Sequence, residues 1–128
     1  MNIAIVSIGD EILIGQIINS NAAWMAESII NVGGRIIEHV VVADDEEHLV
    51  RTLDRLRRES DVIVMTGGLG PTHDDITKPV VARYTNDEIV ERPEVVEFLH
   101  DFMAQRGRTL TDRNRQQALA PSRATVLM

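Results

Sequence analysis

The stretch Val62–Thr77, VIVMTGGLGPTHDDIT, joins a short apolar run to a glycine-rich loop and a pair of aspartates. The run Val62–Thr66 is rich in β-branched residues and has the length of a strand buried on both faces. Gly67, Gly68 and Gly70 then remove three side chains within four residues, which lets backbone N–H groups approach a ligand closely. This order predicts an anion-handling loop at the end of a parallel strand.

The segments before this loop alternate between strand and helix patterns. Ile3–Ile8 and Ile36–Val42 are predicted strands, and Asn21–Val32 has the i, i+3, i+4 apolar spacing of an amphipathic helix. Asp44 or Asp45 can cap a second helix. Strand–helix–strand–helix–strand predicts an α/β fold, a three-layer α/β/α sandwich with a mostly parallel sheet and right-handed crossovers.

The second half of the chain is more helical. One helix is expected after Asp75, another from Pro93 to Gly107, and a short one over Asp112–Leu119. Ala124–Met128, ATVLM, is predicted to form one more strand. No repeat or long linker interrupts the chain, so residues 1–128 are predicted to be a single domain. A buried strand with nothing after it suggests truncation at the C-terminal end.

Composition excludes several classes of function. The 128 residues carry a formal net charge of -7, which argues against a nucleic-acid partner. No apolar run approaches the roughly 20 residues of a membrane span, and the N-terminus is not a signal peptide. The absence of cysteine excludes disulfides and thiolate metal sites. A cytoplasmic protein without a membrane partner is therefore expected.

Acidic residues follow each predicted strand. Asp10 comes directly after the first strand, Asp44 and Asp45 after the second, and Asp74 and Asp75 close the glycine loop. Loops after parallel strands meet at the carboxyl edge of the sheet, where ligands bind. Two carboxylates at a helix start would repel a bare phosphate, so we interpret the loop as a site for a phosphate bridged by a divalent cation. The alternative is a tight turn with an aspartate cap.

Four blocks of sequence resemble one known family. They are SIGDEILIGQIINSNAAWMA, VVADDEEHLV, DVIVMTGGLGPTHDDIT and NRQQALAP, in this order. They resemble the N-terminal domain of the competence/damage-inducible protein A family, within the molybdopterin-binding superfamily. The resemblance covers essentially the whole chain and implies the same α/β/α fold. Family members often add a C-terminal nicotinamide-mononucleotide deamidase domain and carry a GTAPG-like loop after the last strand, neither of which these residues include.

The resemblance implies two activities. In the family, the domain is similar to an ADP-ribose pyrophosphatase that needs a divalent metal, such as magnesium or cobalt, and often potassium. Relatives in molybdenum-cofactor biosynthesis bind molybdopterin and adenylylate it, with aspartates that match Asp44 and Asp75. A non-catalytic nucleotide-sensing module is the third hypothesis. Relatives form dimers or trimers, so a homo-oligomer is expected, with the apolar stripe Val95–Met103 as one candidate contact and core packing as its alternative.

These patterns assign residues to three roles. Asp44 and Asp75 are the predicted catalytic residues, and Asp10, Asp74 and Asp75 are the predicted metal ligands. The predicted ligand and phosphate contacts, to a nucleotide or a pterin phosphate, are Gly9, Thr66, Gly67, Gly68, Gly70, Pro71 and Thr72.

Overall fold

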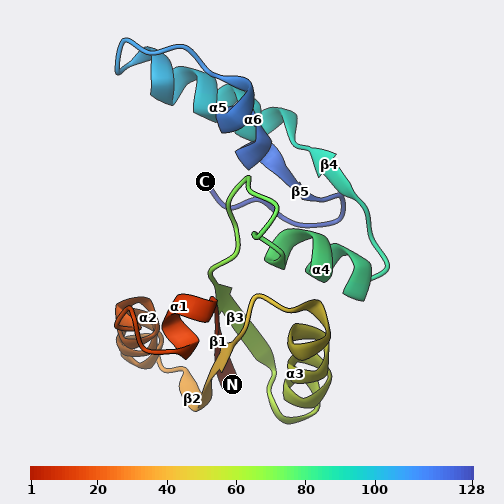
Figure 1. The fold of residues 1–128 in the computed structure, drawn as a ribbon. Coiled ribbons are helices and arrows are strands. Elements are labelled where there is room, and N and C mark those ends of the chain that lie inside the picture. The colour runs from red at the N-terminus through yellow and green to blue at the C-terminus, as the bar shows by residue number, and fades with distance from the viewer. The chain divides into compact units, whose positions relative to one another are not determined.

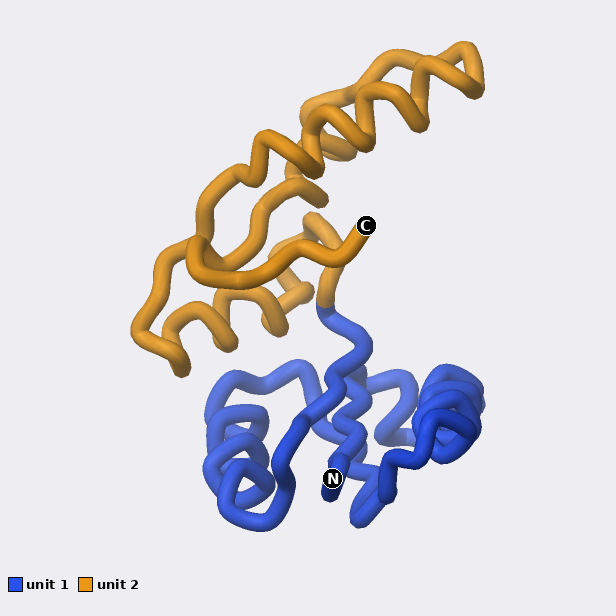
Figure 2. Tube along the Cα trace, turned by 180° about the vertical axis from the view of Figure 1, so that it is seen from behind, with its two compact units in different colours: residues 1–68 blue, residues 69–128 orange.

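The chain forms two compact units in a computed structural model that describes residues 1–128. Unit 1 is Met1–Gly68 and unit 2 is Leu69–Met128 (Figure 2). The boundary falls inside the glycine loop, so the two halves of this loop belong to different units. None of the helices has the length and apolar character needed to cross a membrane.

Unit 1 is a parallel α/β unit (Figure 1). Its elements are β1 (Asn2–Ile8), α1 (Asp10–Leu13), α2 (Ser20–Asn31), β2 (Arg35–Val42), α3 (Glu46–Glu59) and β3 (Val62–Thr66). The strands pair in the order β2-β1-β3, and both pairings are parallel. The predicted alternation of strands and helices is confirmed, and the fold is α/β with a mostly parallel sheet. The four-residue helix α1 was not predicted.

The two crossovers of unit 1 place helices on both faces of the sheet. The chain passes from β1 to β2 on one side and then returns past β1 to β3, so right-handed connections put α2 and α3 on opposite faces. Figure 1 shows them there. β1 is buried from Ile3 to Ile8 because it is the central strand of this three-layer arrangement. Leu49, Leu53 and Leu56 bury the inner stripe of α3 against the sheet.

Side-chain caps fix where the helices of unit 1 begin. The carboxylate of Asp45 accepts a hydrogen bond from the His48 backbone N–H at 2.7 Å, so Asp45 is the cap of α3. The amide oxygen of Asn19 caps α2, and its amide nitrogen donates to the buried Ser7 hydroxyl at 2.9 Å. This bond ties the loop before α2 to the central strand.

Unit 2 combines helices with a short antiparallel ladder. Its elements are α4 (Thr77–Tyr84), β4 (Ile89–Glu91), α5 (Pro93–Ala104), α6 (Asp112–Arg115), the 3-10 helix η1 (Gln116–Ala118) and β5 (Leu119–Pro121). The helices after Asp75 and from Pro93 are confirmed. The predicted helix over Asp112–Leu119 is present as α6 and η1. The pairing of β4 with β5 was not predicted.

The predicted strand Ala124–Met128 is wrong. These residues form no ladder, and Leu127 and Met128 are exposed. A strand exists only when a neighbour accepts its backbone hydrogen bonds, and β-branched composition alone does not supply one. The chain instead turns after β5, where the Arg92 guanidinium donates to the Ala124 carbonyl at 2.7 Å.

The predicted contact stripe on α5 is partly covered by its own helix. The rings of Phe98 and Phe102 stack with centroids 6.1 Å apart. The guanidinium of Arg106 lies 3.5 Å above the centre of the Phe102 ring, in a cation–π arrangement. Both rings remain partly exposed, so this stripe is not fully packed into a core, and its use as a subunit contact stays a prediction.

Candidate functional site

The carboxyl edge of the unit 1 sheet gathers the predicted residues of the first two loops. The register pairs Ser7 with Thr66 and Ile8 with Val42, so the three strands end level with one another. Gly9 and Asp10 follow β1 and Asp44 follows β2 by two residues. Their placement at one edge is what the predicted topology requires. Their ligand contacts stay predictions.

Asp10 and Asp44 hold each other's backbone. The Asp44 N–H donates to one carboxylate oxygen of Asp10 at 2.9 Å, and the Asp10 N–H donates to one oxygen of Asp44 at 3.1 Å. Each carboxylate therefore uses one oxygen to bind the other loop and keeps a second oxygen for another partner. The sequence left Asp44 and Asp45 as alternatives. Because Asp45 caps α3, Asp44 is the carboxylate that belongs to this edge.

This carboxylate pair supplies oxygen atoms of the kind that magnesium prefers. Mg²⁺ is commonly held by one or two carboxylates, with water and substrate phosphate as the remaining ligands. Asp10 and Asp44 supply two such carboxylates. In neither unit do three or more Asp, Glu or His side chains gather as a closed metal-binding group. The residues therefore fit a cation that arrives with water or phosphate ligands of its own.

Gly67 permits the close approach of two strand ends in unit 1. It has φ +92°, in the left-handed region, and a Cβ built on it would lie 2.0 Å from the Ile8 carbonyl oxygen. A backbone atom cannot yield as a flexible side chain would, so only glycine fits. The first glycine of the predicted loop therefore packs against β1 rather than simply lining a ligand site.

The loop of unit 2 folds around the Asp75 carboxylate. One oxygen of Asp75 accepts from the Thr72 backbone N–H at 3.0 Å and from the Thr72 hydroxyl. The Gly70 N–H also donates to this carboxylate, and these bonds, led by that of the Thr72 hydroxyl, lower the pKa of Asp75. A Cβ on Gly70 would lie 2.6 Å from the same oxygen. A side chain at position 70 would therefore push the Asp75 carboxylate out of this arrangement.

Asp75 thus occupies the place in which the sequence predicted a phosphate. The amides expected to cradle an anion do so, but the anion is an internal carboxylate. This arrangement also replaces the proposed aspartate cap, because Asp75 binds loop amides and no side chain caps α4. With this oxygen bonded to Thr72, Asp75 supports the loop.

The middle of the loop points to solvent. The side chains of His73 and Asp74 are 99% and 85% exposed, and their nearest atoms lie 3.3 Å apart. Asp74 is not drawn into the loop with Asp75, so the predicted pair of neighbouring metal ligands is divided between an inward and an outward carboxylate.

A cavity of about 310 Å³ lies beside this loop, within unit 2. Its walls combine the loop with Lys78 and Pro79 of α4 and with residues near β4 and β5. The lining residues are Gly70, Pro71, Thr72, Asp75, Lys78, Pro79, Ile89, Gln116 and Leu119. The predicted ligand contacts of this unit and its predicted catalytic aspartate therefore line a real concavity together.

Lys78 is the one cation of this cavity. Burial lowers the pKa of its ammonium group, and the nearby Asp75 carboxylate partly offsets that effect. One N–H donates to the Gln117 carbonyl at 3.2 Å. A single lysine in a helix is usually solvated, so the sequence pattern alone does not single out Lys78. Its spacing one turn after Asp75 was the available signal.

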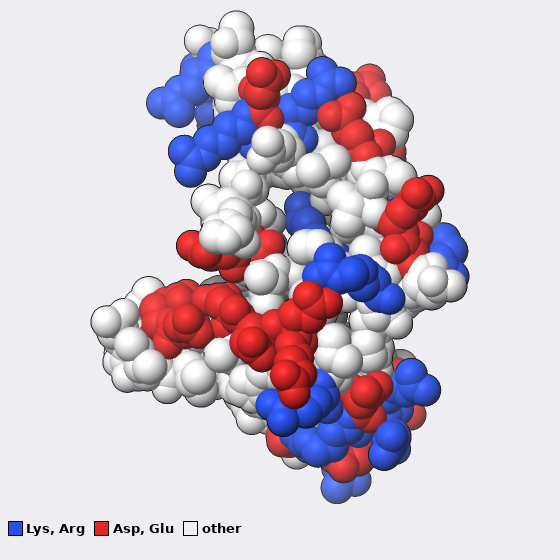
Figure 3. Space-filling view, turned by 45° about the vertical axis from the view of Figure 1, so that its right-hand side comes forward, with Lys and Arg blue, Asp and Glu red and all other residues white.

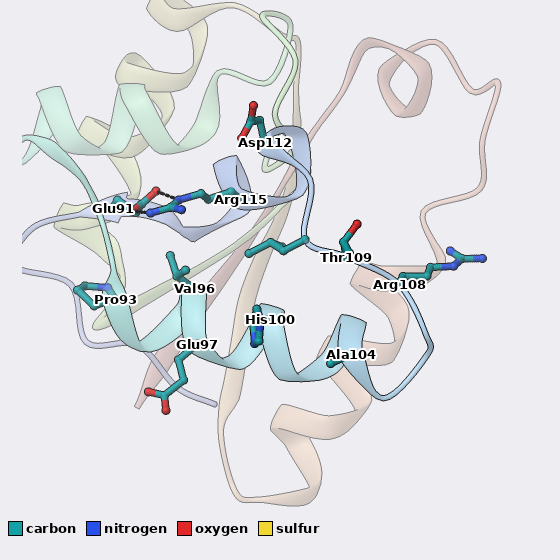
Figure 4. A pocket seen from close by; sticks show the side chains of 11 residues that line it. Glu91, Pro93, Val96, Glu97, His100, Ala104, Arg108, Thr109, Asp112 and Arg115 are labelled. Atoms are coloured by element: carbon teal, nitrogen blue, oxygen red, sulfur yellow. Dashed lines mark hydrogen bonds and ion pairs between the residues drawn. The ribbon is translucent and has the colours of Figure 1, made fainter.

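A larger cavity in unit 2 has a different character. It measures about 770 Å³ and lies between α5 and the segment 108–115 (Figure 4). Arg115 on its wall makes two 2.8 Å hydrogen bonds to the Glu91 carboxylate, drawn as dashed lines. Because its charge is already paired, this arginine is a poor phosphate ligand, and the cavity holds none of the predicted site residues.

The fold and the position of these loops define the class of protein. An open parallel sheet with polar loops at its carboxyl edge is characteristic of α/β domains that bind small molecules there. Residues 4–125 match the family described as the probable molybdopterin binding domain, and the chain belongs to that family.

Similar proteins support this family assignment. The chain is 40% identical over 131 residues to a CinA-like protein of Flavobacterium psychrophilum, a match covering 99% of this chain and 31% of that one. It is 41% identical over 127 residues to the "Putative competence-damage inducible protein" of Clostridium beijerinckii, with the same two coverages. The predicted family is thereby confirmed. The chain spans about a third of the length of these relatives.

Solved structures share the fold. The protein CinA of Thermoplasma acidophilum, described as having unknown function, superposes with a TM-score of 0.78 at 26% identity, over 94% of this chain and 70% of that one. The molybdopterin biosynthesis enzyme MoaB of Thermus thermophilus has a TM-score of 0.57 at 18% identity, covering 77% and 62%. At that identity the second likeness shows the fold alone.

Proposed function

We propose that the chain binds a small phosphate-bearing ligand and hydrolyses the pyrophosphate of a nucleoside diphosphate sugar, with ADP-ribose as the first candidate. The observation that carries the binding step is the cavity of unit 2, in which a half-buried lysine faces the glycine loop. The choice of reaction rests on the family resemblance of the four sequence blocks.

Lys78 supplies the charge for phosphate binding. An ammonium group has three N–H donors, and one is directed at the Gln117 carbonyl. The remaining donors can reach phosphate oxygens in the cavity, where burial strengthens the attraction. The Thr72 hydroxyl, now donating to Asp75, is a second donor to phosphate if it rotates. An anion that displaces the Asp75 carboxylate would accept hydrogen bonds from the same backbone N–H groups, those of Gly70 and Thr72.

The carboxylates of Asp10 and Asp44 are the proposed holders of a divalent cation in unit 1. When bound, such a cation supplies positive charge that neutralises pyrophosphate oxygens. The free oxygen of Asp44 can accept a hydrogen bond from a water molecule and orient it. In the proposed hydrolysis, water adds to a phosphorus atom, the P–O bridge breaks, and AMP and ribose phosphate leave.

AMP release from ADP-ribose, measured with magnesium or cobalt and with potassium, tests this proposal. Asp44→Asn removes a charge but keeps an oxygen that can hold the Asp10 N–H, so it should abolish release without unfolding unit 1. Glu27→Gln, an exposed change on α2, is the matched control. No release above a metal-free blank, from protein with a native circular dichroism spectrum, would defeat the pyrophosphatase proposal.

Molybdopterin binding is the second candidate. Its support is the description of the matched family and the shared fold of the Thermus thermophilus enzyme. Parallel titrations of ADP-ribose and molybdopterin separate the two ligands. Lys78→Met should weaken whichever one binds, because it removes the cation of the cavity and keeps most of the apolar stem.

A sensing module without catalysis is the third candidate. It predicts tight ligand binding and no turnover under any metal condition. Asp44→Asn is the cleaner variant for this question, because Asp75→Asn would also disturb the loop that Asp75 supports. We also propose a cytoplasmic location and a single ligand-binding domain over residues 1–128, which cell fractionation and limited proteolysis can test.

A further inference from the structure

The cavity beside the glycine loop of unit 2 has walls of two kinds. The loop donors and Lys78 are polar, and they hold the phosphate in the proposed function. Four other lining side chains are apolar and half-buried, and the phosphate contacts make no use of them. They come from the loop, α4, β4 and β5 and are called the apolar walls: Pro71, Pro79, Ile89 and Leu119.

The volume of this cavity limits how much of a ligand it holds. At about 310 Å³ it lies at the small end of the range of about 300–1,000 Å³ that ligand pockets occupy. A nucleoside diphosphate sugar has two halves, a nucleoside monophosphate and a sugar phosphate, joined at the pyrophosphate. The cavity therefore has room for one of these halves rather than for both.

The apolar walls favour the half that carries the base. A sugar phosphate would turn hydroxyl groups toward side chains that offer no hydrogen-bond partner, and an unpaired buried hydroxyl is destabilising. A nucleobase has two flat faces that need no such partner, and its polar atoms lie at its edge. The faces of a base can pack against the apolar walls if one polar group of the protein meets that edge.

Gln116 is the side chain that can meet the edge of the base. It begins η1, lines the cavity and is exposed, so its carboxamide is open to a ligand. The next residue, Gln117, accepts the hydrogen bond from Lys78, which keeps the ammonium group near the start of η1. A carboxamide offers two N–H donors and a carbonyl acceptor. Adenine has an amino group beside a ring nitrogen, and glutamine can bond both at once.

The charge of the chain directs a nucleotide to this place. Figure 3 shows acidic side chains in a continuous band over unit 1. With a net charge of -7, the chain repels a phosphate over most of its surface. Because Lys78 is the cation of the cavity, it attracts the phosphate of a nucleotide to a site where the apolar walls and Gln116 can bind the base.

We propose that this cavity binds the nucleoside monophosphate half of the ligand, with adenine against the apolar walls and the Gln116 carboxamide as the contact that selects the base. The identity of the ligand rests on the proposed function. The binding itself uses unit 2 alone and requires neither a metal ion nor turnover.

Three phosphate compounds test this assignment in the absence of metal. They are AMP, ribose 5-phosphate and purine riboside 5′-monophosphate, which lacks only the amino group of adenine. Titration calorimetry of the whole chain should show that AMP binds about tenfold more tightly than ribose 5-phosphate, because the base adds apolar contact. AMP should bind about fivefold more tightly than purine riboside 5′-monophosphate, because one hydrogen bond is lost with the amino group.

Gln116→Leu removes the carboxamide and keeps most of the bulk of the side chain. It should abolish the difference between AMP and purine riboside 5′-monophosphate and leave the affinity for ribose 5-phosphate unchanged. Gln105→Leu is the matched control, because Gln105 is an exposed glutamine at the end of α5 that does not line the cavity. This control should keep the difference between the two nucleotides.

The outcomes separate this assignment from the proposed function. Equal affinities of the wild type for AMP and ribose 5-phosphate would overturn the assignment and leave phosphate binding intact. A preference for AMP over purine riboside 5′-monophosphate that survives in Gln116→Leu would overturn the role of Gln116. No binding of any of the three compounds would defeat both proposals. Selective AMP binding without AMP release from ADP-ribose would support the assignment and defeat only the hydrolysis.

Discussion

Units 1 and 2 are stabilised in different ways. Unit 1 has a sheet whose central strand is buried on both faces, with the leucines of α3 packed against it. In unit 2 the only fully buried apolar side chains are Val80, Ala82 and Ala118, and α5 has none. Apolar burial is the main favourable term in folding, so unit 1 should be the more stable unit.

Unit 2 relies more on polar contacts. Asp87 accepts from the Ser122 hydroxyl and from the Arg123 N–H, joining the start of β4 to the turn after β5. Arg92 binds the Ala124 carbonyl and Arg115 binds Glu91. The candidate cavity beside the glycine loop thus lies in the less well-packed unit, which is where adjustable loops are usually found.

Core truncation should show the largest difference between the units. Leu56→Ala in α3 should cost about 2–5 kcal/mol, because Leu56 is fully buried. Val80→Ala in α4 removes two carbons and should cost about 1.5 kcal/mol. Urea unfolding measures both, with Trp24 fluorescence reporting on unit 1 and Tyr84 ring resonances on unit 2. Leu127→Ala, at an exposed position, serves as the control. Equal losses of stability in the two core variants would mean that both units depend equally on apolar burial.

Gly67→Ala should rank second. Gly33→Ala is its matched partner, since Gly33 has φ +87° and a Cβ added there would meet no atom within 4 Å. Gly33→Ala should lower stability by about 1–2 kcal/mol, the cost of a left-handed L-residue. Gly67→Ala should cost more, because its Cβ would also meet the Ile8 carbonyl. If thermal unfolding shows the same loss of stability for both variants, the close contact between Gly67 and the Ile8 carbonyl adds nothing to the cost of the left-handed backbone.

The fold of unit 1 could be predicted because the spacing of its apolar residues matches the positions that are buried in its strands and helices. Ile3–Ile8 is apolar on both faces, as a central parallel strand must be, and β3 has the predicted bounds. In unit 2 the same reasoning failed at short elements. β4 and β5 have three residues each, and β5 ends in Pro121, so neither carries a readable pattern. Ala124–Met128 has the pattern but no partner strand.

The candidate site was predictable in position but not in detail. The topology brings Asp10 and Asp44 to one edge, and their mutual backbone bonds complete the arrangement. For Asp75 the spacing from Thr72 suits both an outward metal ligand and an inward partner of loop amides. In the folded loop the Asp75 carboxylate points inward and accepts a hydrogen bond from the Thr72 N–H. The role of Lys78 depends on residues of η1 and β5, and its bonded partner Gln117 is 39 positions away.

Acid should loosen unit 2 before unit 1. The Ser122 hydroxyl, followed by the Arg123 N–H, lowers the pKa of Asp87 from 3.8 to about 2. The pKa values of Asp75 and Glu91 in unit 2 are also lowered, as is that of Glu38 in unit 1. A carboxylate with a depressed folded pKa stabilises above its unfolded pKa, and the stability is lost as pH falls through the folded value.

The window for Asp87 therefore runs from about pH 4 down to about pH 2. Carbon-detected titration of the Asp87 carboxyl should give the depressed pKa, and Ser122→Ala should raise it. Over the same window the Tyr84 resonances should broaden or move before Trp24 emission changes. A simultaneous change in both probes would mean that the units unfold together in acid.

The smallest effects on stability are expected at two similar ion pairs, one in each unit. Arg55 binds Glu38 in unit 1 at 2.7 and 2.8 Å, and Arg115 binds Glu91 in unit 2 at 2.8 and 2.8 Å. Lysine cannot make two parallel hydrogen bonds to one carboxylate. Arg55→Lys and Arg115→Lys therefore each remove one bidentate contact and keep the positive charge. Exposed pairs contribute little, and each variant should lower the urea midpoint only slightly.

Local opening should nevertheless separate the two variants. Arg55 joins α3 to β2, which the buried leucines already hold, whereas Arg115 joins α6 to β4, where few apolar contacts add to the ion pair. Amide hydrogen exchange near β4 should therefore accelerate in Arg115→Lys more than exchange near β2 does in Arg55→Lys. High salt should remove the difference, because screening weakens both pairs. Equal acceleration at low salt would mean that unit 2 is not held by its polar contacts, and its three buried apolar side chains would then have to account for its stability.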